Sequence, residues 1–90
     1  MDLLLKEKTA VITGPAKGMG RAISMALAEE GVNLAMLGRD IGAIGPVVED
    51  AEHLGVKAKA IKCDVTKGHM VERAIKDVMS WTKKIDILVN

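Results

Sequence analysis

Short apolar runs and amphipathic helical segments alternate along this chain. The run Thr9–Thr13 is apolar and rich in β-branched residues, which is typical of a strand buried on both faces. Residues 18–30 carry apolar side chains at helical spacing, and Gly31 is placed to end that helix in a left-handed conformation. The helical spacing of residues 18–30 comes from Ala22, Ile23, Ala26 and Leu27. Residues 32–37 form the next extended run.

The same order of elements is repeated in the second half of the chain. A helical stripe ends at Gly55, and because a proline cannot sit deep in a helix interior, we expect this helix to begin near Gly45, with Pro46 near its first position. Residues 56–62 alternate small apolar side chains with lysines, as edge strands do. Thr66 is the expected N-cap of a third helix, and residues 85–89 predict a fourth strand.

The order of elements is therefore β-α-β-α-β-α-β, with about 30 residues in each βα unit. Such alternation implies a parallel sheet with right-handed crossovers. We predict an α/β fold, a Rossmann-like doubly wound parallel sheet of which the first four strands are present. No linker or repeat divides the sequence, so residues 1–90 are expected to form a single, partial domain.

Composition narrows the classes of partner. The chain is 49% hydrophobic and 28% charged, close to the average soluble protein, and its net charge of +1 includes no basic stripe. Trp81 is the only aromatic residue, so stacking platforms for nucleic acid are missing. One cysteine and two histidines are too few for a disulfide or a structural zinc site. The N-terminus has neither a signal peptide nor a membrane span, and we expect a cytoplasmic protein with no nucleic-acid or membrane partner.

A glycine-rich loop lies between the first strand and the first helix. Gly14, Gly18 and Gly20 let the backbone turn sharply, approach a ligand and pack the helix on the strand. The free N–H groups of the helix N-terminus would face an anion such as a pyrophosphate. A Walker A loop is excluded because Met19 stands where its second glycine should be. Turn and packing positions without a ligand are the alternative interpretation of these glycines.

The spacing Thr-Gly-x-x-x-Gly-x-Gly of residues 13–20 resembles the cofactor loop of the short-chain dehydrogenase/reductase family. Residues 63–66 resemble the family's Asp-Val segment, and residues 86–90 resemble its fourth strand entering an Asn-Asn-Ala-Gly motif, of which only the first Asn is present. The resemblance implies hydride transfer between a nicotinamide dinucleotide and a small-molecule carbonyl or alcohol. It implies a cofactor site made by Gly14, Lys17, Gly18, Met19, Gly20, Arg39, Asp64, Val65 and Asn90.

Within that resemblance, the end of the second strand indicates which nicotinamide cofactor is bound. Gly38 stands where an NAD-specific site places a carboxylate, and Arg39 follows it. Asp40 lies beyond the arginine and is better placed to cap the following helix. With Lys17 as a second cation in the glycine loop, NADP(H) is favoured over NAD(H). The alternative is that both cations are solvated surface charges. Asp64 likewise either hydrogen-bonds the adenine amino group, as in the family, or simply begins a turn toward Thr66.

The family's catalytic groups have no counterpart in this chain. The resemblance implies a Tyr-x-x-x-Lys pair assisted by a serine, but the chain contains no Tyr, and Ser24 and Ser80 both fall on expected helices. No catalytic residue is therefore assigned, and the chain is interpreted as the cofactor-binding N-terminal portion of such an oxidoreductase. Residues 87–89 would then form an open apolar edge, so we expect a homo-oligomer. The alternatives are a stand-alone, non-catalytic nucleotide-binding or interaction module, and a nonfunctional remnant.

Overall fold

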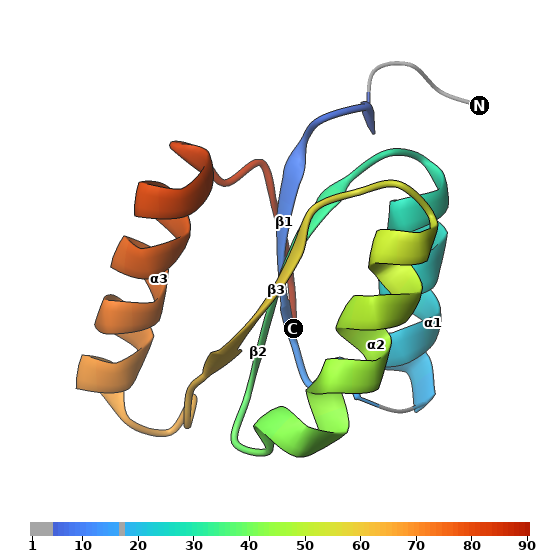
Figure 1. The fold of residues 1–90 in the computed structure, drawn as a ribbon. Coiled ribbons are helices and arrows are strands. Elements are labelled where there is room, and N and C mark those ends of the chain that lie inside the picture. The colour runs from blue at the N-terminus through green and yellow to red at the C-terminus, as the bar shows by residue number, and fades with distance from the viewer. Residues whose placement is uncertain (1–4, 17) are drawn as a thin grey trace.

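The computed structural model describes residues 5–16 and 18–90 of the chain. Strands and helices alternate throughout (Figure 1). In chain order they are β1 (Thr9–Thr13), α1 (Gly18–Glu29), β2 (Asn33–Gly38), α2 (Ile41–His53), β3 (Ala58–Lys62), α3 (Gly68–Thr82) and β4 (Ile87–Val89).

The four strands form one parallel sheet in the order β3-β2-β1-β4. In the register of the central strands, Val11 of β1 stands opposite Ala35 of β2 and Leu88 of β4. Helices α1 and α2 cover one face of the sheet and α3 covers the other (Figure 1). The predicted α/β, Rossmann-like doubly wound arrangement is confirmed.

Two apolar cores lie on the two faces of this sheet. Ala10 and Ile12 of β1 point into the core beneath α1 and α2, whereas Val11 points into the core beneath α3. Strand β1 is thus buried on both faces, as its apolar run predicts. Strand β3 is an edge strand, also as predicted, and its Lys59 and Lys62 are exposed to solvent.

Helix α1 packs on the sheet through two small, fully buried side chains and through Met25 and Leu27, which are partly buried against the core. Its buried residues are Ser24 and Ala28, whereas Ala22 and Ala26 are exposed. The Ser24 hydroxyl donates to the carbonyl oxygen of Gly20 at 2.8 Å, so this buried polar side chain is satisfied within the helix. The predicted apolar stripe therefore identifies the packing face only in part: Leu27 does pack against the core, but the fully buried positions are held by small residues that let the helix approach the sheet closely.

Helix α2 begins at Ile41, earlier than the start expected near Gly45, so that prediction is wrong. The Asp40 carboxylate caps the helix by accepting from the backbone N–H of Ala43 at 3.2 Å, as the sequence suggested for this residue. Pro46 consequently lies inside the helix. A proline normally disfavours helical backbone at the preceding residue by clashing with its Cβ, and Gly45 has none.

Helix α3 begins at Gly68 and its N-cap is Lys67, so the prediction of Thr66 as the cap is wrong. Thr66 is engaged elsewhere, because its backbone N–H and its hydroxyl both donate to Oδ1 of Asp64, at 3.0 and 2.6 Å. The turn that Asp64 begins therefore ends before the helix starts. The fourth strand is also shorter than predicted, beginning at Ile87.

The hydroxyl of Thr9 is buried and has no hydrogen-bond partner within residues 5–16 and 18–90. An unsatisfied buried hydroxyl is destabilising, so Thr9→Val is expected to raise the free energy of unfolding by about 1 kcal/mol. Thr13→Val is the matched control, because the Thr13 hydroxyl lies within bonding distance of Val89 O and Asn90 Oδ1. The control should lose about 0.5–1.5 kcal/mol in the same urea titration. A gain in both variants, or in neither, would contradict this interpretation.

Asp86 ties the start of β4 to the start of β1, and this contact predicts a pH dependence of stability. The Thr9 N–H donates to Asp86 Oδ2 at 2.9 Å, which lowers the pKa of the Asp86 carboxyl below its ordinary value, with Lys84 adding to the effect. A lowered folded-state pKa stabilises the fold above the ordinary carboxyl pKa, and that contribution is lost as pH falls through the lowered value.

Asp86→Asn is therefore expected to be less stable than the parent chain near neutral pH, with the gap closing as the pH falls below the ordinary carboxyl pKa of about 4 and through the lowered value. Urea unfolding at a series of pH values measures this gap. Asp77→Asn, which removes an exposed carboxylate from α3, is the control and should show no such convergence. A constant gap for Asp86→Asn would mean that its ionised carboxylate does not stabilise the fold.

Candidate functional site

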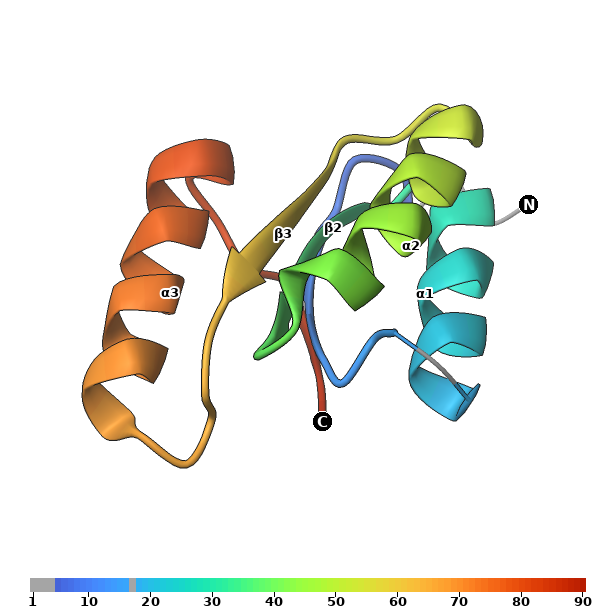
Figure 2. The same cartoon turned by 60° about the horizontal axis from the view of Figure 1, so that its bottom comes forward.

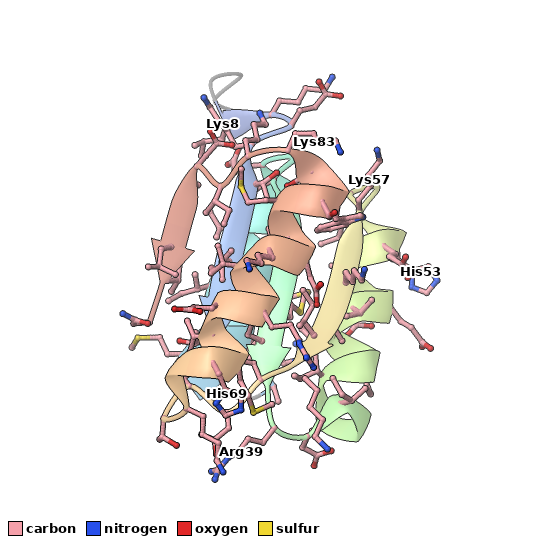
Figure 3. The ribbon with its side chains drawn as sticks, turned by 90° about the vertical axis from the view of Figure 1, so that its left-hand side faces the viewer. Lys8, Arg39, His53, Lys57, His69 and Lys83 are labelled. Atoms are coloured by element: carbon pink, nitrogen blue, oxygen red, sulfur yellow. The ribbon has the colours of Figure 1, made fainter. Side chains whose placement is uncertain are left out.

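The candidate site lies at the carboxyl ends of the parallel strands. The loops after β1 and β2 lie at this end of the molecule in Figure 1, and Figure 2 shows the chain end after β4 near them. Arg39 and His69 also lie at this end, whereas Lys8, Lys57 and Lys83 lie at the opposite one (Figure 3). The chain leaves β1 toward one face of the sheet and leaves β3 toward the other. Open α/β sheets bind ligands at the carboxyl edge where the chain changes face in this way.

The glycine loop has a backbone that other residues could not adopt without strain. Gly14 and Gly18 have φ angles of +64° and +63°, in the left-handed region. Gly20 meets a different constraint, because a Cβ there would stand 2.0 Å from the carbonyl oxygen of Gly14. The N-terminus of α1 is thereby held directly against the end of β1. No acidic residue lies in the first turn of α1, so no carboxylate competes there with a bound anion.

Two cavities flank Arg39. The α2-side cavity, of about 340 Å³, lies between the glycine loop and the start of α2. The β4-side cavity, of about 470 Å³, reaches from the glycine loop to the ends of β3 and β4. Gly14, Gly38 and Arg39 line both cavities. An extended ligand lying across the carboxyl edge of the sheet would therefore pass this arginine.

The β4-side cavity brings together most of the site residues expected from the sequence. Gly14 and Arg39 are joined in its lining by Asp64, Val65 and Asn90, which come from distant parts of the chain. Gly18, Met19 and Gly20 lie at the start of α1 and line neither cavity, and the Met19 side chain is 78% exposed. The expectation for Lys17 lies outside the described residues.

The Asp64 carboxylate is fixed by its own turn. Oδ1 accepts both hydrogen bonds from Thr66, and these bonds, followed by the charges of Arg39 and Lys67, lower the pKa of the carboxyl below its ordinary value. Oδ2 has no hydrogen-bond partner in the described part of the chain. The turn from Asp64 toward Thr66, which the sequence offered as the alternative to a role at the adenine, is present in the structure. Asp64 lines the β4-side cavity, and its second carboxylate oxygen is not used by the turn.

Thr13 is a site residue to which sequence reasoning assigned no role. Its hydroxyl is 3.2 Å from the carbonyl oxygen of Val89 and 3.4 Å from Oδ1 of Asn90, so it connects the ends of β1 and β4. Its position directly before Gly14 was visible in the sequence. Its partner was not, because the contact joins residues that only strand pairing brings together.

Cys63 also lines the β4-side cavity, but its thiol is not activated as a nucleophile. The residue is 1% exposed, and burial raises the pKa of its thiol, with the neighbouring Asp64 charge adding to the effect. A thiol in this state is a weak nucleophile. Within residues 5–16 and 18–90, no three His, Cys, Asp or Glu side chains form a group that could hold a metal ion, and no helix is long and apolar enough to cross a membrane.

A model of the short chain dehydrogenase family matches residues 8–90, which is nearly the whole chain. The chain belongs to the short-chain dehydrogenase family. Among curated relatives of this family, a 3-oxoacyl-[acyl-carrier-protein] reductase of Staphylococcus epidermidis is 40% identical over 84 residues, which cover 92% of this chain and 34% of the relative. The chain thus spans about a third of the length of this relative.

Solved structures of short-chain dehydrogenases share the arrangement of elements. L-sorbose reductase from Gluconobacter frateurii, complexed with NADPH and L-sorbose, matches with a TM-score of 0.93 and 32% identity, covering 100% of this chain and 35% of the reductase. A short chain dehydrogenase/reductase from Burkholderia phymatum, in complex with NAD, matches with a TM-score of 0.89 and 28% identity, covering 98% of this chain and 31% of that protein. Both cofactor types therefore occur among proteins of this fold.

The contact between Gly20 and Gly14 gives a direct test of the loop geometry. Gly20→Ala places a methyl group inside the van der Waals radius of a backbone oxygen, and we expect the free energy of unfolding to fall by about 1–3 kcal/mol or more. Gly68→Ala, at the start of α3 with open space around it, is the control and should be neutral or stabilising by up to about 1 kcal/mol. Urea unfolding of both variants and of the parent chain measures these changes in the free energy of unfolding. Equal stability would show that α1 can move away from β1 at little cost.

Proposed function

We propose that this chain is the cofactor-binding N-terminal portion of a short-chain oxidoreductase that prefers NADP(H) to NAD(H). Arg39 carries the proposal. It follows Gly38 at the end of β2, where a carboxylate would select NAD, and it lines both cavities. Arg39 has no ion-pair partner in the described part of the chain, so its guanidinium is available to a phosphate.

The residues present fit a dinucleotide lying across the carboxyl edge of the sheet. Gly14, Gly18 and Gly20 hold the start of α1 where its N–H groups can receive a pyrophosphate. Asp64 and Val65 would receive the adenine, with the free Oδ2 of Asp64 accepting from its amino group. We assign Lys17, as a second cation beside Arg39, to the 2′-phosphate of NADP(H), and Met19 and Asn90 to the cofactor's surroundings, as the family resemblance implies. The relatives complexed with NADPH and with NAD support the same class of ligand.

When bound, the nicotinamide supplies the hydride that is exchanged with a carbonyl or alcohol. Residues 1–90 bind and orient the cofactor in this proposal, and they form a single, partial domain. The chain contains no Tyr, Ser24 is buried and bonded to Gly20 O, and Ser80 lies exposed on α3. We therefore place the proton donor and the substrate-binding groups outside these residues. We further propose that the oxidoreductase acts on a small-molecule carbonyl or alcohol. We also propose that it is cytoplasmic and forms a homo-oligomer.

Titration of the purified chain with NADPH and, separately, with NADH tests the cofactor assignment. The parent chain is expected to bind both saturably and NADPH more tightly. Arg39→Asp should raise the Kd for NADPH about tenfold to a hundredfold, because a charge-assisted phosphate contact becomes a repulsion, and the Kd for NADH by no more than about threefold.

Lys57→Asp is the matched control for Arg39→Asp, because it makes the same change of charge at the opposite end of the molecule (Figure 3). It should leave both dissociation constants unchanged. Binding of neither nucleotide to the folded chain would contradict the cofactor site as a whole. Equal loss of NADH and NADPH binding in Arg39→Asp would contradict only the preference for NADP(H).

A further inference from the structure

A third cavity, of about 320 Å³, lies where the end of β3 meets the first two turns of α3. We call it the α3-side cavity. Its lining residues are Lys62 of β3 and His69, Met70 and Arg73 of α3. None of them lines either of the two cavities beside Arg39, so the α3-side cavity is separate from the proposed cofactor site.

Three of the four side chains that line the α3-side cavity are basic, and none is acidic. Lys62, His69 and Arg73 make no ion pair and no side-chain hydrogen bond within residues 5–16 and 18–90. Asp77 follows Arg73 by one helical turn, yet the two side chains are not paired there either. Neighbouring cations without a counter-ion repel one another, and an anion between them would replace that repulsion by attraction.

The donors around the cavity suit a phosphate group. His69 and Arg73 are four residues apart on α3, so their side chains lie on the same face of the helix. The guanidinium offers a planar pair of N–H groups that matches two phosphate oxygens, and Lys62 adds an ammonium from a different element. The imidazole of His69 can donate a further N–H. Because no acidic residue lies in the first turn of α3, no carboxylate there competes with the anion.

Met70 gives the same cavity an apolar part. Its side chain is half-buried and packs against the core beneath α3. A phosphate that carries an organic group could place its charge on the basic residues and its carbon atoms on the Met70 side chain. Inorganic phosphate could make only the first of these contacts. The volume of the cavity is at the lower end of the range for small-molecule sites, about 300–1,000 Å³.

We propose that the α3-side cavity binds a small organic phosphate monoester, held by Arg73 and Lys62, with His69 as a further donor and Met70 against the organic group. The ligand joins the end of β3 to the start of α3, and these are the two ends of the loop that carries Asp64 and Val65. The proposal does not depend on the cofactor assignment, since the two sites share no lining residue.

Titration of the isotope-labelled chain with phenyl phosphate, followed by amide NMR at constant ionic strength, tests this site. Saturable shifts are expected for the amides of residues 68–73, with a Kd of about 1 mM or lower. Inorganic phosphate should shift the same amides but bind about twofold to tenfold more weakly, because it lacks the contact with Met70.

Arg73→Gln removes the bidentate cation and keeps a long, helix-forming side chain, so the Kd for phenyl phosphate should rise about tenfold or more. Lys62→Gln should raise it about threefold to tenfold. Lys83→Gln is the matched control, because it removes one positive charge at the end of α3 opposite His69 (Figure 3), and it should leave the Kd unchanged. All three side chains are exposed, so the variants should keep the dispersed amide spectrum of the folded chain.

Arg39→Asp should leave the shifts of residues 68–73 unchanged, which separates this site from the proposed cofactor site. Loss of those shifts in Arg39→Asp would overturn the proposal, because the phosphate would then occupy the cofactor site. Equal weakening in Arg73→Gln and Lys83→Gln would also overturn it, since binding would follow net charge alone. No saturable shift of residues 68–73 in the folded parent chain would overturn it too, and would leave the proposed function standing.

Discussion

The contact between Gly20 and the carbonyl oxygen of Gly14 fixes the geometry on which the candidate site depends. A side chain at residue 20 would overlap that oxygen, so the hydrogen of glycine alone lets α1 start directly against the end of β1. The close approach continues along the helix, where Ser24 and Ala28 are the buried residues. The consequence is that the start of α1 lies beside the end of β1, where the free N–H groups of the helix could receive an anion.

Short side-chain contacts at the strand ends complete the site around this helix. Asp40 ends the loop after β2 by capping α2, and Asp64 holds the turn that begins the loop after β3 by accepting two hydrogen bonds from Thr66. Thr13 connects the end of β1 to that of β4. Each contact uses one side-chain oxygen to hold the backbone, and Asp40 and Asp64, which each line a cavity, have a second carboxylate oxygen that these contacts do not use. The same residues therefore shape the loops and supply charge to the space between them.

Much of the fold followed from pattern because its elements are locally encoded. The continuous apolar run of β1 predicted a strand buried on both faces, and the alternating lysines of β3 predicted an edge strand. Both patterns can be recognised in a few consecutive residues. The misses arose where a second residue overrode a local rule. Gly45 removed the usual conflict before Pro46, so α2 began at Asp40's cap, and Asp64 captured Thr66, so α3 began without a side-chain cap. The apolar stripe of α1 predicted a helix correctly but only part of the face that packs, since Leu27 contacts the core while Ala22 and Ala26 are exposed.

The sequence by itself determined the order of elements, the glycine spacing and the presence of Arg39 after the second strand, because each is a property of adjacent residues and the backbone conformations they allow. The tertiary structure alone decided that Arg39 lies between two cavities, that Asp40 shares one of them, and that Thr13 meets the end of β4. These contacts join residues from different βα units. Their distances are set by strand register and by how closely the helices approach the sheet, and neither quantity can be read from neighbours along the chain.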